Sequence, residues 1–431
     1  MRPCAAPKTP VLVFNLGHNA VQHGALGVVR TLGRMGVDVY AVVDGHLAPT
    51  AVSRYSKASF VWNTGNQKPE QIAAGLLTIG ARIGRKAILV ATDDRAAAIV
   101  AEQAEVLEES FIFSRLPRCL PRQLANKREL CLLCNEIGIP SPEMVFPLCL
   151  GDVHAFIEQA QFPVVVKAAD AQRLPKGSRG TSIVKTPAEL LRIYEQTERS
   201  GCPNLIFQEY IPRHAGEDWI FHGYVNPRTG CFVSFTGKKL RSYPAFAGPT
   251  TLGITAANET LRRQTEKLLK ATGYAGIMDM DYRFDKRDGQ YKLLDFNPRI
   301  GANFRMFENG AGIDVVRAMY LDLSGKTVPP SPVMKERAFV VESHDWMAGM
   351  GYIRDGELTA GEWWRSLKGR KELAWFCRED PLPALVACGR LLARKMRRAV
   401  RKRLTGSPEM YPRQAPAKHQ VPGWDPGVGG D

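Results

Sequence analysis

The chain has 431 residues, of which 45% are hydrophobic and 23% are charged, with a formal net charge of +15. This composition is typical of a soluble globular protein with two or three domains, and it excludes a fibrous or wholly disordered chain. No apolar run reaches membrane-spanning length, and the nine cysteines form no paired framework, so we expect reduced thiols and a cytoplasmic location.

Residues 11–115 alternate strand and helix patterns. We expect strands at Val11–Phe14, Val37–Val43 and Ala87–Ala91 and helices at Gly24–Met35 and Arg95–Leu107. This order predicts a parallel, three-layer α/β domain. The first apolar run stops too soon, at Asn15, for a signal peptide, so we interpret it as a strand. The loop around His18 that follows is either a ligand loop at the sheet edge or a simple turn.

A domain boundary is expected near Pro117 and Pro121, and a helix follows. Asn126, with Glu129 three residues later, has the pattern of a helix start, and Gly138 ends the helix. Cys131 and Cys134 have metal-binding or redox spacing, but they lie on the apolar stripe of this helix and a second cysteine pair is missing. We therefore predict that both pack in the core.

Two segments suggest a site for phosphate. The apolar strand Phe162–Val166 runs into Lys167, which either extends to solvent or serves an anion. Ten residues later the small-residue loop Lys176–Ser182 offers backbone amides that surround phosphate oxygens without Cβ obstruction. Because the loop follows the strand so closely, we favour the anion.

Acidic residues follow the next strand, Leu205–Ile211. Glu209 could read the amino group of an adenine and Glu217 could accept from ribose hydroxyls, and a solvated surface acid is the alternative for each. His214 and His222 lie nearby, and we interpret both as structural rather than as bases.

The most informative segment is a hairpin formed by Gly276–Tyr282 and Lys292–Arg299. Asp295 and Asn297 are two residues apart, so they point to one face of their strand, and pairing brings Asp281 to that face. Three oxygen ligands on neighbouring strands suit Mg²⁺. Arg299 follows directly, with a guanidinium suited to phosphate. An exposed hairpin with ordinary surface acids is the alternative.

In this order, the motifs resemble the ATP-grasp ligases over roughly residues 10–325. The resemblance is greatest to the carboxylate–amine ligase branch, which includes enzymes similar to D-alanine–D-alanine ligase and D-aspartate ligase. The motifs are Asn126-Lys127, Val166-Lys167, Lys176–Ser182, Gln208–Ile211, Gly216–Asp218, Asp281 and Asp295–Arg299.

The resemblance implies a mixed α/β and α+β architecture, in which an ATP-grasp fold follows an N-terminal Rossmann-like domain. We expect the Rossmann-like domain at 1–118, the ATP-grasp domain at 119–330 with two lobes split near 207, a C-terminal helical extension at 331–404 and a disordered tail at 405–431.

The resemblance also implies roles for individual residues. Nucleotide-binding residues would be Lys127, Lys167, Lys176, Gly177, Ser178, Arg179, Gly180, Gln208, Glu209, Tyr210, Ile211 and Glu217. Asp281, Asp295 and Asn297 would bind Mg²⁺, with Mn²⁺ as an alternative, and Arg299, Lys238 and Arg241 would face the transferred phosphate and the carboxylate substrate. The family usually has Glu where this chain has Asp295, which puts a second metal ion in doubt.

The implied activity is ATP-dependent ligation of a small-molecule carboxylate to an amine. An acyl phosphate would form first, and ADP and phosphate would be released. This chemistry needs positioning and charge neutralisation more than a protein nucleophile. The alternatives are a non-catalytic ATP-binding regulatory module and another ATP-grasp chemistry such as carboxylation. A homo-oligomer is compatible with each of these functions.

Much of the positive charge lies near the C-terminus, where 390–403 contains eight Lys or Arg residues. Pro383–Leu404 reads as one helix with the apolar stripe Leu385, Leu392, Met396 and Val400. This basic helix either contacts an anionic membrane or packs its stripe on its own domain. No nucleic-acid partner is expected, because no aromatic-interleaved basic strand or finger motif is present.

Overall fold

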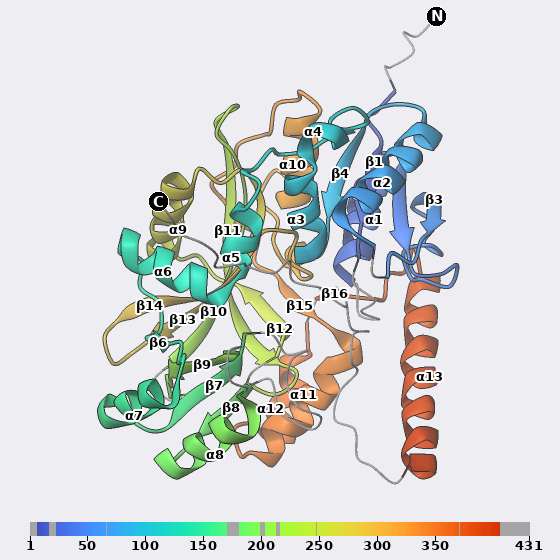
Figure 1. Cartoon of the computed structure of the whole chain (residues 1–431). Helices are drawn as coiled ribbons and strands as arrows, with labels where there is room; N and C mark the ends of the chain where they lie inside the picture. The colour runs from blue at the N-terminus through green and yellow to red at the C-terminus, as the bar shows by residue number, and fades with distance from the viewer. Residues whose placement is uncertain are drawn as a thin grey trace, which may run out of the picture.

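The computed structural model (Figure 1) describes residues 7–16, 23–65, 67–169, 181–198, 203–212, 216–246, 248–369 and 371–405. Within these residues the strands form three sheets of five, four and seven strands. The helices pack on the faces of the sheets, and four apolar clusters fill the space between the layers.

The first sheet is parallel throughout and has the order β3-β2-β1-β4-β5. Its strands are β1 (Val11–Phe14), β2 (Val39–Val43), β3 (Ser56–Val61), β4 (Ala87–Ala91) and β5 (Phe111–Ile112). Its helices are α1 (His23–Arg34), α2 (Pro69–Ile83), α3 (Asp94–Glu102) and α4 (Ala104–Leu107). The predicted parallel α/β domain is confirmed, although the helix expected over 95–107 is interrupted at Gln103.

Two helices connect this domain to the second sheet: α5 (Leu120–Ala125) and α6 (Lys127–Ile137). Asn126 caps α6 as predicted, since its side chain accepts hydrogen bonds from the amides of Arg128 and Glu129, and the left-handed Gly138 ends the helix. Cys131 and Cys134 are buried, which confirms their core role. Burial raises the pKa of Cys134 to about 12.

The second sheet has the order β6-β9-β7-β8. It is formed by β6 (Met144–Val145), β7 (Val164–Ala168), β8 (Thr181–Val184) and β9 (Leu205–Glu209), with helices α7 (Leu150–Gln159) and α8 (Pro187–Thr197). Val164 and Val166 of β7 point into the apolar cluster that these elements share. Along the chain β9 is the last strand of this sheet, so the chain leaves the lobe just after Glu209.

The third sheet has the order β14-β13-β10-β11-β12-β15-β16. Its strands are β10 (Gly216–Asn226), β11 (Cys231–Ser242), β12 (Thr250–Thr255), β13 (Gly276–Asp285), β14 (Gln290–Asn297), β15 (Ala338–Val340) and β16 (Glu372–Leu373). One face shares an apolar cluster with α9 (Glu259–Thr272). The other face shares a cluster with α1, with η3 (Phe304–Met306) and with α10 (Val315–Leu323).

The segment after residue 330 is built into this body rather than appended to it. It contributes β15 and β16 to the third sheet, together with α11 (Glu342–Arg354), α12 (Ala360–Ser366) and α13 (Leu382–Thr405). Arg30 of α1 is fully buried, and its Nε lies 2.9 Å from Oδ2 of Asp380. None of the helices in the described residues is long and apolar enough to cross a bilayer.

Candidate functional site

The hairpin of β13 and β14 brings the predicted metal ligands together. Asp281 lies directly opposite Asp295 in the strand pairing, and Asp279 lies opposite Asn297. Opposed residues in an antiparallel pair point to the same face, so the predicted shared face of Asp281, Asp295 and Asn297 is confirmed. Asp279, which sequence reasoning left out of the metal set, is the fourth oxygen-bearing residue on this face.

Lysines already pair with two of these carboxylates. Nζ of Lys239 on β11 lies 2.8 Å from Oδ1 of Asp281, and Nζ of Lys127 lies 3.3 Å from Oδ1 of Asp295. Burial raises the pKa of Asp281, and the nearby Asp279 adds to the effect. Burial alone would lower the pKa of Lys239, but the carboxylates around it outweigh burial and raise that pKa. Each of the two opposed carboxylates therefore has one lysine as its partner.

Lys167 approaches the cluster from β7. Its Nζ donates to Oε1 of Gln208 over 2.7 Å. Burial lowers the pKa of Lys167 to about 8, and the positive charge of Lys127 adds to the shift while Asp295 opposes it. Lys167 is half-buried and close to a second lysine, so a bound anion would stabilise its charged form. The predicted loop residues Lys176, Gly177, Ser178, Arg179 and Gly180 lie outside the described residues.

Arg299 is held by three side chains. Its guanidinium donates to Oδ2 of Asp279 and to Oδ1 of Asn297, each over 2.8 Å, and its Nε lies 3.2 Å from Oδ1 of Asp94. Asp94 begins α3, so the first domain reaches this site directly. His222 is fully buried, with Nε2 3.1 Å from Oδ1 of Asp279. Burial would raise the pKa of Asp279, but His222 and Arg299 outweigh it and hold the pKa below its usual range.

Gly301 makes this close packing feasible. A Cβ at that position would lie 2.1 Å from Cε1 of His222 and 2.6 Å from Cγ of Asp279. We therefore expect Gly301→Ala to lower the free energy of unfolding by about 1–3 kcal/mol, because an added methyl forces a packed group to move. Denaturant unfolding measures the change. Gly361→Ala is the control, since a Cβ there has no neighbour within 4 Å. Equal stability of both variants would contradict the packing.

Glu209, expected at the adenine edge, has a carboxylate that is already paired. One oxygen accepts from Nζ of Lys292 over 2.7 Å and the other from Arg287 over 2.8 Å. The carbonyl of Tyr210 faces Arg287 at 3.5 Å, and that of Ile211 accepts from Arg283 over 3.3 Å. This network ties the strand that leaves the second sheet to the hairpin of the third.

Glu217 and Lys238 lie on the opposite face of the third sheet from Asp281. Their side chains form an ion pair over 2.8 Å. Nζ of Lys238 lies 4.8 Å from the centre of the Trp219 ring, and Trp219 belongs to the apolar cluster that the third sheet shares with α9. Their neighbours in sequence, Asp218 and Lys239, share the face of Asp281, because alternate residues of a strand point to opposite faces. The structure thus does not bring Glu217 and Lys238 into the carboxylate cluster.

Arg241, predicted to face the phosphate and the carboxylate substrate, has a different partner. It is 4% exposed, and its guanidinium donates to both carboxylate oxygens of Asp345 on α11, over 2.9 and 2.8 Å. Thr251 and Trp363 complete the coordination of Asp345, at 3.0 and 3.2 Å. The charge of Arg241 is therefore neutralised inside the protein.

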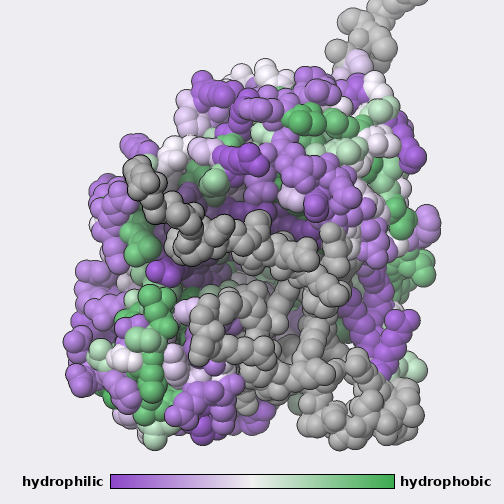
Figure 2. All heavy atoms as spheres, viewed as in Figure 1, coloured by the Kyte–Doolittle hydropathy of each residue, from purple (hydrophilic) through white to green (hydrophobic). Residues whose placement is uncertain are grey.

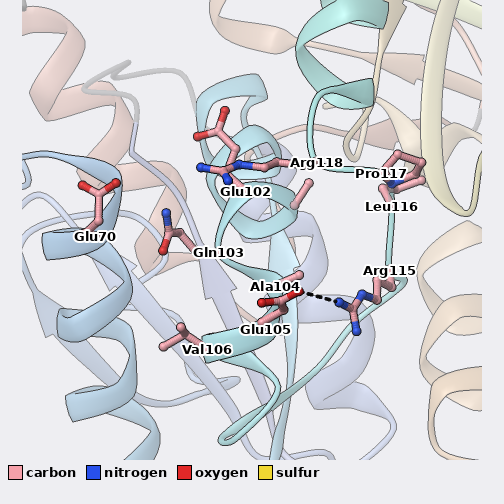
Figure 3. A pocket seen from close by; sticks show the side chains of 11 residues that line it. Glu70, Glu102, Gln103, Ala104, Glu105, Val106, Arg115, Leu116, Pro117 and Arg118 are labelled. Carbon is pink, nitrogen blue, oxygen red and sulfur yellow. Dashed lines mark ion pairs between the residues drawn. The ribbon is translucent and has the colours of Figure 1, made fainter.

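Figure 2 shows a hollow with a hydrophilic surface between the upper and lower parts of the molecule. The pocket in Figure 3 is a separate feature at the surface of the first domain. Residues of α3, α4 and the segment 115–118 line it, and Arg115 lies 3.5 Å from Glu105 there. No predicted site residue lines this pocket.

The donor set of the hairpin fits Mg²⁺. Two opposed carboxylates and one amide oxygen are hard ligands of the kind that Mg²⁺ takes in proteins. Among the described residues no three His, Cys, Asp or Glu side chains converge as a complete metal-binding group. A partial protein shell is what Mg²⁺ sites use, because phosphate and water supply the remaining ligands.

No model of a known protein family matches the chain. By sequence, 243 residues are 27% identical to D-aspartate ligase from Enterococcus faecium (strain Aus0004), and the match covers 53% of this chain and 57% of that ligase. The chain thus spans little more than half the length of this relative.

Two solved structures are similar in fold. N5-carboxyaminoimidazole synthetase from Staphylococcus aureus, complexed with ADP, has a TM-score of 0.58 at 12% identity, covering 77% of this chain and 82% of that one. The biotin carboxylase domain of 2-oxoglutarate carboxylase from Hydrogenobacter thermophilus, in complex with MgADP, ADP and bicarbonate, has a TM-score of 0.56 at 15% identity. That match covers 75% of this chain and 72% of the domain.

The fold and the sequence similarity point to the same class of protein. In fold and in sequence the chain is similar to the ATP-grasp superfamily of ligases. Within that superfamily it is similar to the carboxylate–amine ligases, as its motifs indicated.

Proposed function

We propose that the chain is an ATP-dependent carboxylate–amine ligase that forms an amide through an acyl phosphate. The observation that carries the proposal is the pairing of Asp281 with Asp295, with Lys239, Lys127 and Lys167 around them. Acids and lysines in alternation suit a nucleotide polyphosphate bound with a divalent cation, since each charge then finds a partner of opposite sign.

Asp281, Asp295 and Asn297 would hold Mg²⁺ (Mn²⁺ is an alternative), which would neutralise phosphate charge when bound. Lys127 and Lys239, now paired with those carboxylates, would be free to pair with phosphate oxygens. Arg299, kept in place by Asp94 and Asp279, would stabilise negative charge at the carboxylate that reacts.

The adenine and ribose contacts are proposed for Gln208, Glu209, Tyr210, Ile211 and their neighbours, as in the family. Of the adjacent acids Glu217 and Asp218, Asp218 is the better placed for the nucleotide, because it lies on the same face of the third sheet as Asp281. Its carboxylate is held by Arg283 over 2.7 and 3.0 Å. The family role of Glu217 would require its side chain to leave Lys238.

The test is a hydroxylamine-trapping screen with ATP and Mg²⁺ over amino acids and other carboxylates. A ligase should give a hydroxamate with one class of acid and release ADP. Carboxylation is the second candidate, because the two structural neighbours reported above include a carboxylase. ADP release that depends on bicarbonate, without any hydroxamate, would favour carboxylation. ATP binding without turnover under every condition would favour a regulatory module.

The lowered pKa of Lys167 predicts that nucleotide binding depends on pH. With its pKa near 8, the ammonium loses its proton as the pH rises through that value, whereas an ordinary lysine keeps it to about pH 10. A bound phosphate would favour the protonated form. ADP affinity should therefore fall between about pH 7 and about pH 9.5, and binding above pH 8 should take up a proton. Calorimetry in buffers of different ionisation enthalpy measures the uptake.

Lys167→Ala should abolish this proton uptake and weaken nucleotide binding roughly ten- to hundredfold, the scale of a lost charged hydrogen bond. Lys185→Ala is the matched control, because Lys185 is exposed just after β8. Unchanged affinity and proton uptake in Lys167→Ala would remove Lys167 from the site.

A further inference from the structure

The helix α13 exposes its apolar stripe to solvent. Leu385, Leu392 and Met396 are 68%, 60% and 67% exposed. On the side of the helix that meets the body, Ala384 and Ala387 pack against the main apolar cluster, and Arg390 forms an ion pair with Asp44. The alternative in which these three residues pack on the protein's own domain is therefore wrong. The predicted helix itself is confirmed.

Aromatic and sulfur-containing side chains border the stripe. Nζ of Lys395 lies 5.0 Å from the centre of the Trp346 ring on α11, so a side chain of α13 reaches a side chain of α11 at this point. Trp346 is 44% exposed, and Met350, one turn further along α11, is 62% exposed. Lys395 is three residues after Leu392, which places the tryptophan beside the stripe. The sequence of α13 alone contains no such anchor.

We propose that this surface, named the α13 face and formed by Leu385, Leu392, Met396, Trp346 and Met350, docks on a membrane that contains anionic lipids. The helix contains eight Lys or Arg residues and no Asp or Glu, so its charge is complementary to acidic headgroups. An apolar stripe flanked by basic residues is the pattern of a helix that lies in the bilayer interface, where tryptophan is also favoured.

Other occupants fit the α13 face less well. Two copies of α13 would bring two strongly positive helices together with no acidic residue of either helix between them. A nucleic acid would satisfy the basic residues, but phosphate contacts make no use of exposed leucine and methionine. The proposed membrane docking is independent of the proposed ligase chemistry.

The test is co-sedimentation of the full-length protein with phosphatidylcholine vesicles, with and without phosphatidylserine. We expect binding only with phosphatidylserine and release at high salt. The triple variant Leu385→Asp, Leu392→Asp, Met396→Asp should bind at least about tenfold more weakly. The control triple Leu132→Asp, Leu148→Asp, Val333→Asp adds the same charge at leucines and a valine that are 51%, 62% and 64% exposed elsewhere, and it should bind like the wild type.

Circular dichroism and ADP binding of both triple variants show that the body is intact. Failure of the wild type to sediment with any vesicle would overturn the proposal, as would equal loss in both triple variants. Tight, salt-sensitive binding to RNA with none to vesicles would assign the basic residues to nucleic acid instead. Dissociation of a homo-oligomer by the stripe triple, without vesicle binding by the wild type, would assign the α13 face to a second copy.

Discussion

Asp295→Asn is expected to lower Mg²⁺-dependent ADP release at least about a hundredfold while leaving the fold intact, because it removes half of the opposed carboxylate pair from the site. The same change removes the acid that holds Lys127 at 3.3 Å. ADP release with the carboxylate identified by hydroxylamine trapping measures turnover, and Mg²⁺ titration of ADP binding separates metal loss from lysine displacement.

Asp288→Asn is the matched control for this variant. It makes the same chemical change in the turn of the same hairpin, where Asp288 is 39% exposed and lies 3.1 Å from Lys292. We expect activity within about twofold of wild type, since Asp288 is at the surface and Lys292 keeps Glu209 and Asp285 as partners. Near-normal turnover of Asp295→Asn would refute the assignment of the hairpin to metal binding.

Arg241→Met is expected to destabilise the protein by about 3–5 kcal/mol, because it leaves the carboxylate of Asp345 buried without its partner. Denaturant unfolding gives the free energy. The double variant Arg241→Met, Asp345→Leu should recover most of the stability, since removing both charges of a buried pair is far less costly than removing one. Arg262→Met is the control, because Arg262 pairs with Glu259 at the surface and is 41% exposed.

Activity of the double variant then separates the two roles of Arg241. If Arg241 is structural, the repacked double variant should regain turnover along with stability. If Arg241 also contacts the phosphate or the carboxylate substrate, as the family resemblance implied, the double variant should be folded and inactive. A stable, inactive Arg241→Met single variant would contradict the stabilising role of the pair.

The local part of the site could be predicted from the sequence. The period-two spacing of Asp295 and Asn297, with a polar turn before their strand, was enough to place Asp281 beside them. The cap of α6 at Asn126 was equally local. Such signals depend on residues a few positions apart, and backbone geometry alone fixes where their side chains point.

The rest depended on contacts that the sequence does not encode locally. Whether Lys238 or Lys239 faces the carboxylates is decided by how β11 pairs with β10, and a shift of one residue reverses every side chain. Asp94 joins Arg299 only because the first domain packs against the third sheet. Arg241 was assigned by family position, and its partner Asp345 lies 104 residues further along the chain.

The ion pair of Arg30 and Asp380 has a consequence for how the protein is made. Its two members are 350 residues apart, so a ribosome adding about 5–20 residues per second delivers the aspartate roughly 20–70 s after the arginine. Until then Arg30 lacks both its counter-charge and the carbonyls of Trp375 and Asp380 that accept its other hydrogen bonds, so its guanidinium cannot be buried without a large cost. The first domain can therefore acquire its final packing only after nearly the whole chain has emerged, and nascent chains stalled before Asp380 should be markedly more sensitive to protease in their first hundred or so residues.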